Sequence, residues 1–212
     1  MLHIKNFYFN PLRACCSVLW DDSAPQCVIV DPGYADQDER ERLTGFIERN
    51  GLIPEKILLT HGHFDHTHGV RDCSATYGAA VYMHPADKAM TEGFDSTDLH
   101  DGDVVAAGPA LKLHVIATPG HTPGGVCFYE AEAKVLLSGD TLFAGCIGRT
   151  DLPGGDYDDL MRSIMEKLMG LDGDVTVIPG HGPKTSIAEE AARNPFLIPF
   201  NEPQDEGADE NG

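Results

Sequence analysis

Short apolar runs alternate along this chain with amphipathic segments, and most of the runs end in a polar or glycine-rich turn. Short runs of this kind, bounded by turn residues, are typical of buried strands. We therefore expect strands over residues 4–9, 14–20, 26–30, 56–59, 80–84, 111–117, 125–130, 135–137 and 175–178.

Segments with apolar residues at helical spacing lie between and after these strands. The clearest spans residues 36–50, where Asp36 and Glu39 have the spacing of a capping box and Gly51 provides a stop. Further helices are expected over residues 68–77, 86–90, 156–169 and 189–194. Strands grouped at the start of each half, with helices between and after them, predict an α+β fold. In this fold two packed sheets are covered by helices on both outer faces.

The chain has 212 residues and no internal linker, so residues 1–200 are expected to form one domain. Its 15 basic and 34 acidic residues give a formal charge of −19. Proteins that bind nucleic acid usually carry a basic stripe, so nucleic acid is not an expected partner. Part of the acidity lies in residues 201–212, which are expected to form a disordered tail.

The N-terminal residues and the cysteines bear on the compartment. Residues 1–7 lack a charged segment followed by an apolar stretch, so no secretory signal is expected. No run reaches the roughly 20 apolar residues of a membrane span. The six cysteines show no CxxC spacing. We therefore expect a cytoplasmic protein with reduced thiols and no membrane partner. The sequence does not indicate an oligomeric state.

Histidines and aspartates gather where predicted strands end. The densest cluster is HxHxDH at residues 61–66, and single candidates follow three later strands. Three histidines and one aspartate within six residues are too close to share one face of a regular element, which favours a loop wrapped around an ion. The candidate metal ligands are His61, His63, Asp65, His66, His121, Asp140 and His181.

Imidazole and carboxylate ligands without thiolate are typical of a catalytic zinc, iron or manganese centre rather than of a closed structural site. A chance cluster of surface histidines is the alternative interpretation. The three downstream candidates, His121, Asp140 and His181, argue against it because they recur in matching positions at strand ends. The pattern therefore indicates a metallohydrolase.

The order HxHxDH, His, Asp, His on strand-end loops resembles the metallo-β-lactamase superfamily, whose fold is a four-layer αββα sandwich. The motifs THGHFDH, PGHTPG, SGDTLFAGCIGRTD and IPGHGP look most like its glyoxalase II (hydroxyacylglutathione hydrolase) branch and the small single-domain relatives. The resemblance implies that His61, His63 and His121 hold one metal ion. It implies that Asp65, His66 and His181 hold a second ion and that Asp140 bridges the two.

The chemistry of a dinuclear site agrees with this division. Two dications a few ångströms apart need an anionic bridge, and Asp140 is the strand-end carboxylate available. Two ions, zinc first and iron or manganese as alternatives, can share a hydroxide and polarise a carbonyl. Asp65 would bind metal and orient that hydroxide. The expected reaction is hydrolysis of a small thioester such as S-lactoylglutathione.

The loop after Asp140 supplies candidates for substrate binding. By resemblance to the family, Phe143, Cys146 and Arg149 lie where substrate is contacted. Arg149 either binds a substrate carboxylate or forms a salt bridge within the loop. Asp31, which ends a predicted strand, either orients a ligand histidine or is a plain turn aspartate.

Two features leave other functions open. Only 31 residues follow His181, whereas glyoxalase II enzymes carry a C-terminal helical domain that grips glutathione, so a weak grip is expected. The GRTD stretch at residues 148–151 is similar to the persulfide dioxygenase branch, which uses one non-haem iron. A mononuclear iron persulfide dioxygenase is therefore an alternative. Other hydrolases of the fold and a non-catalytic metal-binding module also remain open.

Overall fold

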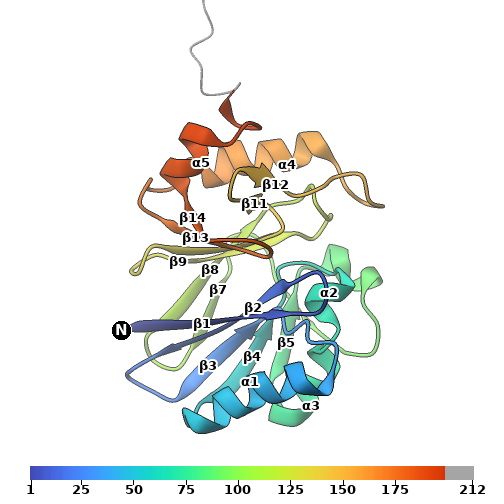
Figure 1. The fold of residues 1–212 in the computed structure, drawn as a ribbon, viewed down its shortest axis with the longest axis vertical. Coiled ribbons are helices and arrows are strands. Elements are labelled where there is room, and N and C mark those ends of the chain that lie inside the picture. The colour runs from blue at the N-terminus through green and yellow to red at the C-terminus, as the bar shows by residue number, and fades with distance from the viewer. Residues whose placement is uncertain (199–212) are drawn as a thin grey trace, which may run out of the picture.

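Two six-stranded sheets lie face to face, and helices cover the outer face of each (Figure 1). The four layers are those of the predicted αββα sandwich. The computed structural model describes residues 1–198, so the predicted acidic tail at residues 201–212 lies outside the described residues. Within the described part of the chain, no helix is long and apolar enough to cross a membrane.

In the first sheet, the spatial order of the strands follows the chain from β1 to β6. The strands are β1 Leu2–Phe9, β2 Ala14–Asp21, β3 Gln26–Val30, β4 Ile53–Leu58, β5 Ala80–Met83 and β6 Thr97–Asp98. Strands β3 to β6 run parallel, and parallel neighbours need crossover connections. Helices α1 (Gln37–Arg49) and α3 (Val70–Tyr77) provide two of them. The carboxyl ends of these strands therefore meet at one edge.

The second sheet has the order β14-β13-β10-β9-β8-β7. Its strands are β7 Val104–Ala107, β8 Leu111–Ala117, β9 Val126–Glu130, β10 Val135–Gly139, β13 Thr176–Pro179 and β14 Thr185–Ser186. Helices α4 (Tyr157–Ser163) and α5 (Ile187–Arg193) cover its outer face (Figure 1). Between β10 and α4, a short hairpin of β11 (Leu142–Phe143) and β12 (Cys146–Ile147) projects from the sheet.

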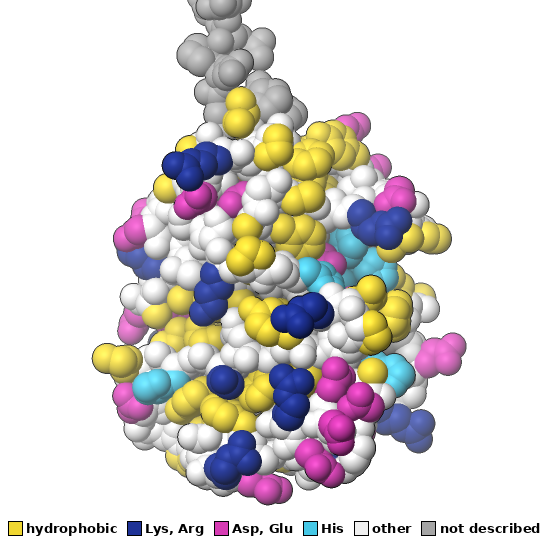
Figure 2. Space-filling model, viewed as in Figure 1, with side chains coloured by type: hydrophobic (Ala, Val, Ile, Leu, Met, Phe, Trp, Pro, Cys, Tyr) yellow, Lys and Arg dark blue, Asp and Glu magenta, His cyan; other side chains and the backbone are white. Residues whose placement is uncertain are grey.

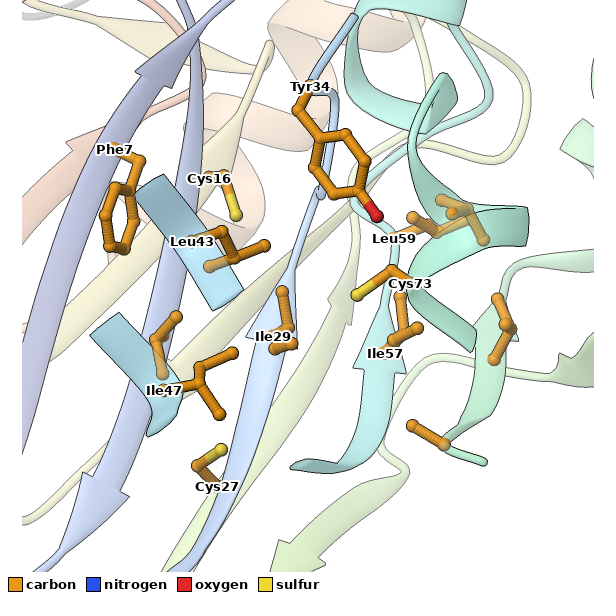
Figure 3. Close-up of a cluster of buried hydrophobic side chains, with 14 of the residues drawn as sticks. Phe7, Cys16, Cys27, Ile29, Tyr34, Leu43, Ile47, Ile57, Leu59 and Cys73 are labelled. Carbon is orange, nitrogen blue, oxygen red and sulfur yellow. The ribbon is translucent and has the colours of Figure 1, made fainter. Parts of the chain in front are cut away.

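Apolar side chains fill the space between the first sheet and its helices. Leu43 and Ile47 of α1 and Cys73 of α3 pack with Phe7 of β1 and Ile29 of β3 (Figure 3). Leu43 and Ile47 lie four positions apart, so one face of α1 is apolar and the helix is held to the sheet by their burial.

Two further clusters hold the remaining layers together. One lies between the sheets and includes Leu19, Val28, Leu58, Leu113, Val115 and Phe128. The other joins the second sheet to α4 and α5 and includes Leu136, Val177, Leu160, Ile164 and Ile187. Because β3 and β10 are buried on both faces, they are apolar runs, whereas β8 alternates buried and exposed residues.

The structure corrects several predicted elements. The helix expected over residues 68–77 begins at Val70, and a separate short helix, α2 (Phe64–Thr67), precedes it. The helix over residues 156–169 becomes π-helical at Ile164–Leu168. The short helix expected over residues 86–90 is present as a 3-10 helix over Pro85–Met90. The sequence did not predict the short strands β6, β7, β11, β12 and β14.

Candidate metal centre

All seven predicted ligands converge at the edge where strands of both sheets end. His61 and His63 lie in the loop after β4, whereas Asp65 and His66 lie on α2. The single loop predicted for residues 61–66 is therefore a loop at its first two ligands and a helix at the other two. The other three follow β8, β10 and β13 of the second sheet, and they are His121, Asp140 and His181.

The first ligand group consists of His61, His63 and His121. One side-chain nitrogen of each lies within 4.8 Å of the others. His63 Nδ1 lies 2.9 Å from His121 Nε2, and the rings of His61 and His63 meet edge to face. His61 and His121 are buried, and His63 is half-buried, so the three nitrogens converge in a place largely shielded from solvent.

The second ligand group consists of Asp65, His66 and His181, whose ligand atoms also lie within 4.8 Å of one another. Asp140 lies between the two groups. Its carboxylate oxygens are 3.4 Å from His66 Nε2, 3.4 Å from His121 Nε2 and 3.5 Å from His181 Nε2. A carboxylate shared by both groups has the position that a bridging ligand needs.

Hydrogen bonds behind the groups fix the histidine tautomers. Asp31 Oδ2 accepts from His66 Nδ1 at 2.9 Å and from the Thr60 hydroxyl at 2.6 Å. The Thr60 hydroxyl therefore accepts from His61 Nδ1 at 3.0 Å. Asp31 adopts a φ of 51°, a strained value for a residue other than glycine. Of the two roles predicted for Asp31, the structure favours orientation of a histidine.

Backbone carbonyls fix the tautomers of the two histidines that follow strands of the second sheet. His121 Nδ1 donates to the carbonyl of Arg149 at 2.7 Å, and His181 Nδ1 donates to the carbonyl of Leu12 at 2.9 Å. With Nδ1 as donor, Nε2 of a neutral ring carries the lone pair. That lone pair points toward the ligand group.

Two buried polar atoms of the site have no hydrogen-bond partner among the described residues: Nε2 of His61 and Oδ1 of Asp140. Unpartnered buried polar atoms are uncommon and need a physical reason. A divalent cation satisfies an imidazole lone pair and a carboxylate oxygen together. The donor set, which is nitrogen and oxygen without sulfur, fits zinc, iron or manganese.

Two histidines of the first group, His61 and His63, favour the neutral form. Burial and the neighbouring imidazoles lower the pKa of His61 well below its usual value. Burial and His121 lower the pKa of His63 in the same direction, against the opposing carboxylates. Neutral imidazole is the form that binds metal, so these two side chains can bind a cation near neutral pH.

In the second group, carboxylates lie close to histidines, and each kind of side chain shifts the pKa of the other. Burial opposes the charge on His66, but Asp140 and Asp31 raise its pKa to about 9. Burial opposes the charge on His181 as well, and its hydrogen bond with Asp65 raises its pKa. Burial opposes the charge on Asp65, but its hydrogen bond with His181 and the charges of His66 and His181 together lower its pKa. Cations and protons therefore compete for these nitrogens.

A pocket of about 580 Å³ opens over both ligand groups. Apolar side chains form much of its wall, and they are Leu12, Phe64, Phe143, Ile147 and Leu152. Figure 2 shows histidine side chains beside hydrophobic ones on this face. Phe64 is 67% exposed and Leu12 is 54% exposed, an unusual state for large apolar side chains. Leu12, from the turn between β1 and β2, was not predicted as a site residue.

The two other predicted substrate-binding residues, Arg149 and Cys146, differ in their position relative to the pocket. Arg149 lines the pocket, but its Nε and Nη2 donate to the carboxylate of Asp151 at 2.8 and 2.7 Å. Cys146 is exposed on β12 and is not among the described residues that line the pocket. The structure therefore brings Phe143 and Arg149 to the pocket and leaves Cys146 beside it.

Comparison with known proteins agrees with this geometry. The family model of the metallo-beta-lactamase superfamily matches residues 16–181. The chain belongs to this superfamily. It is 40% identical to the hydroxyacylglutathione hydrolase GloC of Haemophilus influenzae, over 86% of this chain and 92% of GloC. It is 38% identical to the probable metallo-hydrolase YqgX of Bacillus subtilis, over 91% of this chain and 96% of that protein. The similarity to GloC supports the glyoxalase II-like branch.

Solved structures of the metallo-beta-lactamase superfamily superpose closely on the chain. BLEG-1 B3 metallo-beta-lactamase matches with a TM-score of 0.84 and 35% identity, over 92% of this chain and 99% of that protein. TTHA1623 in a di-iron-bound form matches with a TM-score of 0.81 and 34% identity, over 91% and 100% of the two chains. Members of the superfamily bind divalent metals, and this chain has the histidine and aspartate clusters for it.

Proposed function

We propose that the protein is a dinuclear metal-dependent thioester hydrolase of the hydroxyacylglutathione type. The observation that carries this proposal is the pair of complete ligand groups with the Asp140 carboxylate between them, open to one pocket. In this proposal His61, His63 and His121 hold one ion, Asp65, His66 and His181 hold the other, and Asp140 touches both. Zinc is the first choice of metal, with iron or manganese as alternatives.

Bound dications would supply Lewis acidity, which lowers the pKa of water and polarises a substrate carbonyl. The residues of the chain provide the remaining functions. Asp65 lines the pocket as a carboxylate, and we assign it the orientation of the attacking water and acceptance of its proton. Water oxygen adds to the thioester carbon, the carbon–sulfur bond breaks, and the proton passes to the departing thiolate.

The pocket wall supports a small acyl thioester as the substrate. Phe64, Phe143 and Leu152 present apolar surface beside the ligand groups, which excludes bulk water and contacts the acyl or thiol portion. Arg149 lies at the same wall and would bind a substrate carboxylate after releasing Asp151. Both side chains of this ion pair are exposed, so its exchange costs little.

The mononuclear iron dioxygenase is a weaker alternative. One iron needs only one ligand group, whereas Asp65, His66 and His181 form a second complete group with ligand atoms within 4.8 Å. A single iron would leave this second group without a metal to bind, which favours two ions.

Metal analysis combined with a thioester assay tests the proposal. Protein reconstituted with excess Zn²⁺ is expected to hold two ions per chain and to release thiol from S-lactoylglutathione. One ion per chain would favour the dioxygenase instead. Two ions without thiol release would contradict the thioester hydrolase and leave a hydrolase with another substrate or a non-catalytic metal-binding module.

A further inference from the structure

Asp87 lies behind the first ligand group, in the 3-10 helix Pro85–Met90, and it is fully buried. Its carboxylate accepts three hydrogen bonds from two loops. The backbone N–H of Gly62 donates to Oδ2 at 2.9 Å, and the Thr122 hydroxyl donates to the same oxygen at 2.7 Å. The backbone N–H of Gly124 donates to Oδ1 at 2.6 Å.

These donors stand next to the proposed ligands. Gly62 lies between His61 and His63, and Thr122 directly follows His121. One carboxylate therefore ties the loop after β4, from the first sheet, to the loop after β8, from the second sheet. No hydrogen bond or ion pair joins Asp87 to any of the three histidines, so Asp87 acts on them only through neighbouring residues of their loops.

Glycine at two positions makes this contact possible. A Cβ on Gly124 would lie 2.7 Å from the carboxyl carbon of Asp87, and a Cβ on Gly62 would lie 3.0 Å from its backbone oxygen. Any side chain at residue 124 would push the loop away from the carboxylate. Gly62 of the HGH motif and Gly124 of the PGHTPG motif therefore allow the close approach to Asp87.

We propose that Asp87 is a positioning residue that sets the distances among His61, His63 and His121 of the first ligand group. A buried carboxylate with three donors has a defined position, because each lost bond would leave a buried polar group unpaired. Its position fixes where His61 and His63 stand relative to His121. The inference rests on the ligand assignment of the proposed function.

Glu190 of α5 provides a matched control. It is also buried, and its carboxylate accepts from the Gly145 N–H, the Thr185 hydroxyl and the Asn194 amide. It has as many donors as Asp87, and the donors bring together segments that hold none of the proposed ligands. Substitution of Glu190 therefore reproduces the loss of a buried carboxylate without disturbing a ligand loop.

The test compares Asp87→Asn with Glu190→Gln, each in a His181→Ala background that disables the second group. An asparagine has one acceptor oxygen, so at least one of the backbone N–H groups that face residue 87 loses its acceptor. Zn²⁺ affinity is measured by competition with a chromophoric chelator, with folding checked by circular dichroism. We expect Asp87→Asn to weaken Zn²⁺ binding about ten- to a hundredfold, and Glu190→Gln to leave it within about twofold.

Thr122→Val supplies a milder variant that keeps the shape of the side chain if Asp87→Asn fails to fold. It removes one hydrogen bond to Asp87, and we expect a several-fold loss of Zn²⁺ affinity that Thr122→Ser restores. Equal affinities for the parent, Asp87→Asn and Thr122→Val proteins would overturn the inference. So would an equal loss in Glu190→Gln. If the wild-type protein bound no metal, the proposed function would fail instead.

Discussion

At the scale of single residues, Asp140 has contacts that no other proposed ligand has. Its carboxylate lies within 3.5 Å of histidine nitrogens from both ligand groups. We expect Asp140→Ala to weaken both metal positions more than about tenfold, because each loses charge neutralisation. His181→Ala should chiefly empty the second position. Metal content after dialysis measures both. Retention of two ions and normal activity by Asp140→Ala would show that the bridge is assigned wrongly.

Arg149 shows how a residue can have two partners. Its guanidinium pairs with Asp151 while it lines the pocket. If it binds a substrate carboxylate, Arg149→Ala should raise KM for S-lactoylglutathione about three- to tenfold with a smaller change in kcat, since uniform binding is lost. Asp151→Ala, the control, removes the competitor and should lower KM or leave it. An unchanged KM in Arg149→Ala would leave the ion pair with Asp151 as its role.

At the scale of elements, glycines beside the ligands decide how closely loops and helices pack. Gly120 precedes His121 with a φ of +132°, and a Cβ there would overlap the backbone of Leu160 in α4. Gly182 follows His181 with a φ of +81° and faces open space. We expect Gly120→Ala to destabilise the metal-free protein by about 3 kcal/mol and Gly182→Ala by about 1 kcal/mol. Urea unfolding measures both, and equal losses would contradict the steric argument.

The elements also show where sequence patterns stop being informative. The apolar run at residues 26–30 predicts β3 correctly because a strand buried on both faces needs a continuous apolar stretch. Asp36 caps α1 as expected by accepting from the Glu39 N–H. The Glu39 carboxylate, however, does not complete the capping box and accepts instead from the N–H groups of Asn10 and Ala35. A partner 29 residues away leaves no local pattern.

The site, like the fold, has a part that the sequence predicts and a part that it does not. Residue type and strand-end position were enough to predict the seven candidate ligands, and the fold brings all of them together. The break before α3 depends on contact between distant segments, since the N–H of Gly69 donates to the carbonyl of Pro32. Asp87 gave no signal either, because its partners lie 25 to 37 residues away.

At the scale of the whole molecule, burial separates one cysteine from the other five. Burial raises the pKa of the Cys27 and Cys73 thiols to about 12 and of the Cys15 and Cys127 thiols to about 11, whereas Cys146 is exposed. Thiolate is the reactive form. Iodoacetamide at pH 8 should therefore add one group to the native chain and six in denaturant, as read by mass spectrometry. Several adducts on the native protein would contradict the described packing.

The ligand groups also have a mechanical consequence, because they draw on both sheets. His61 follows β4 of the first sheet, whereas His121 and His181 follow strands of the second. Ions held between them would act as removable cross-links between the two halves of the sandwich. Above the dissociation constant, each tenfold rise in free metal should then add about 1.4 kcal/mol per site to the unfolding free energy. The midpoint of thermal unfolding would therefore rise with metal concentration. A chelator would weaken the contact between the two sheets before either sheet unfolded.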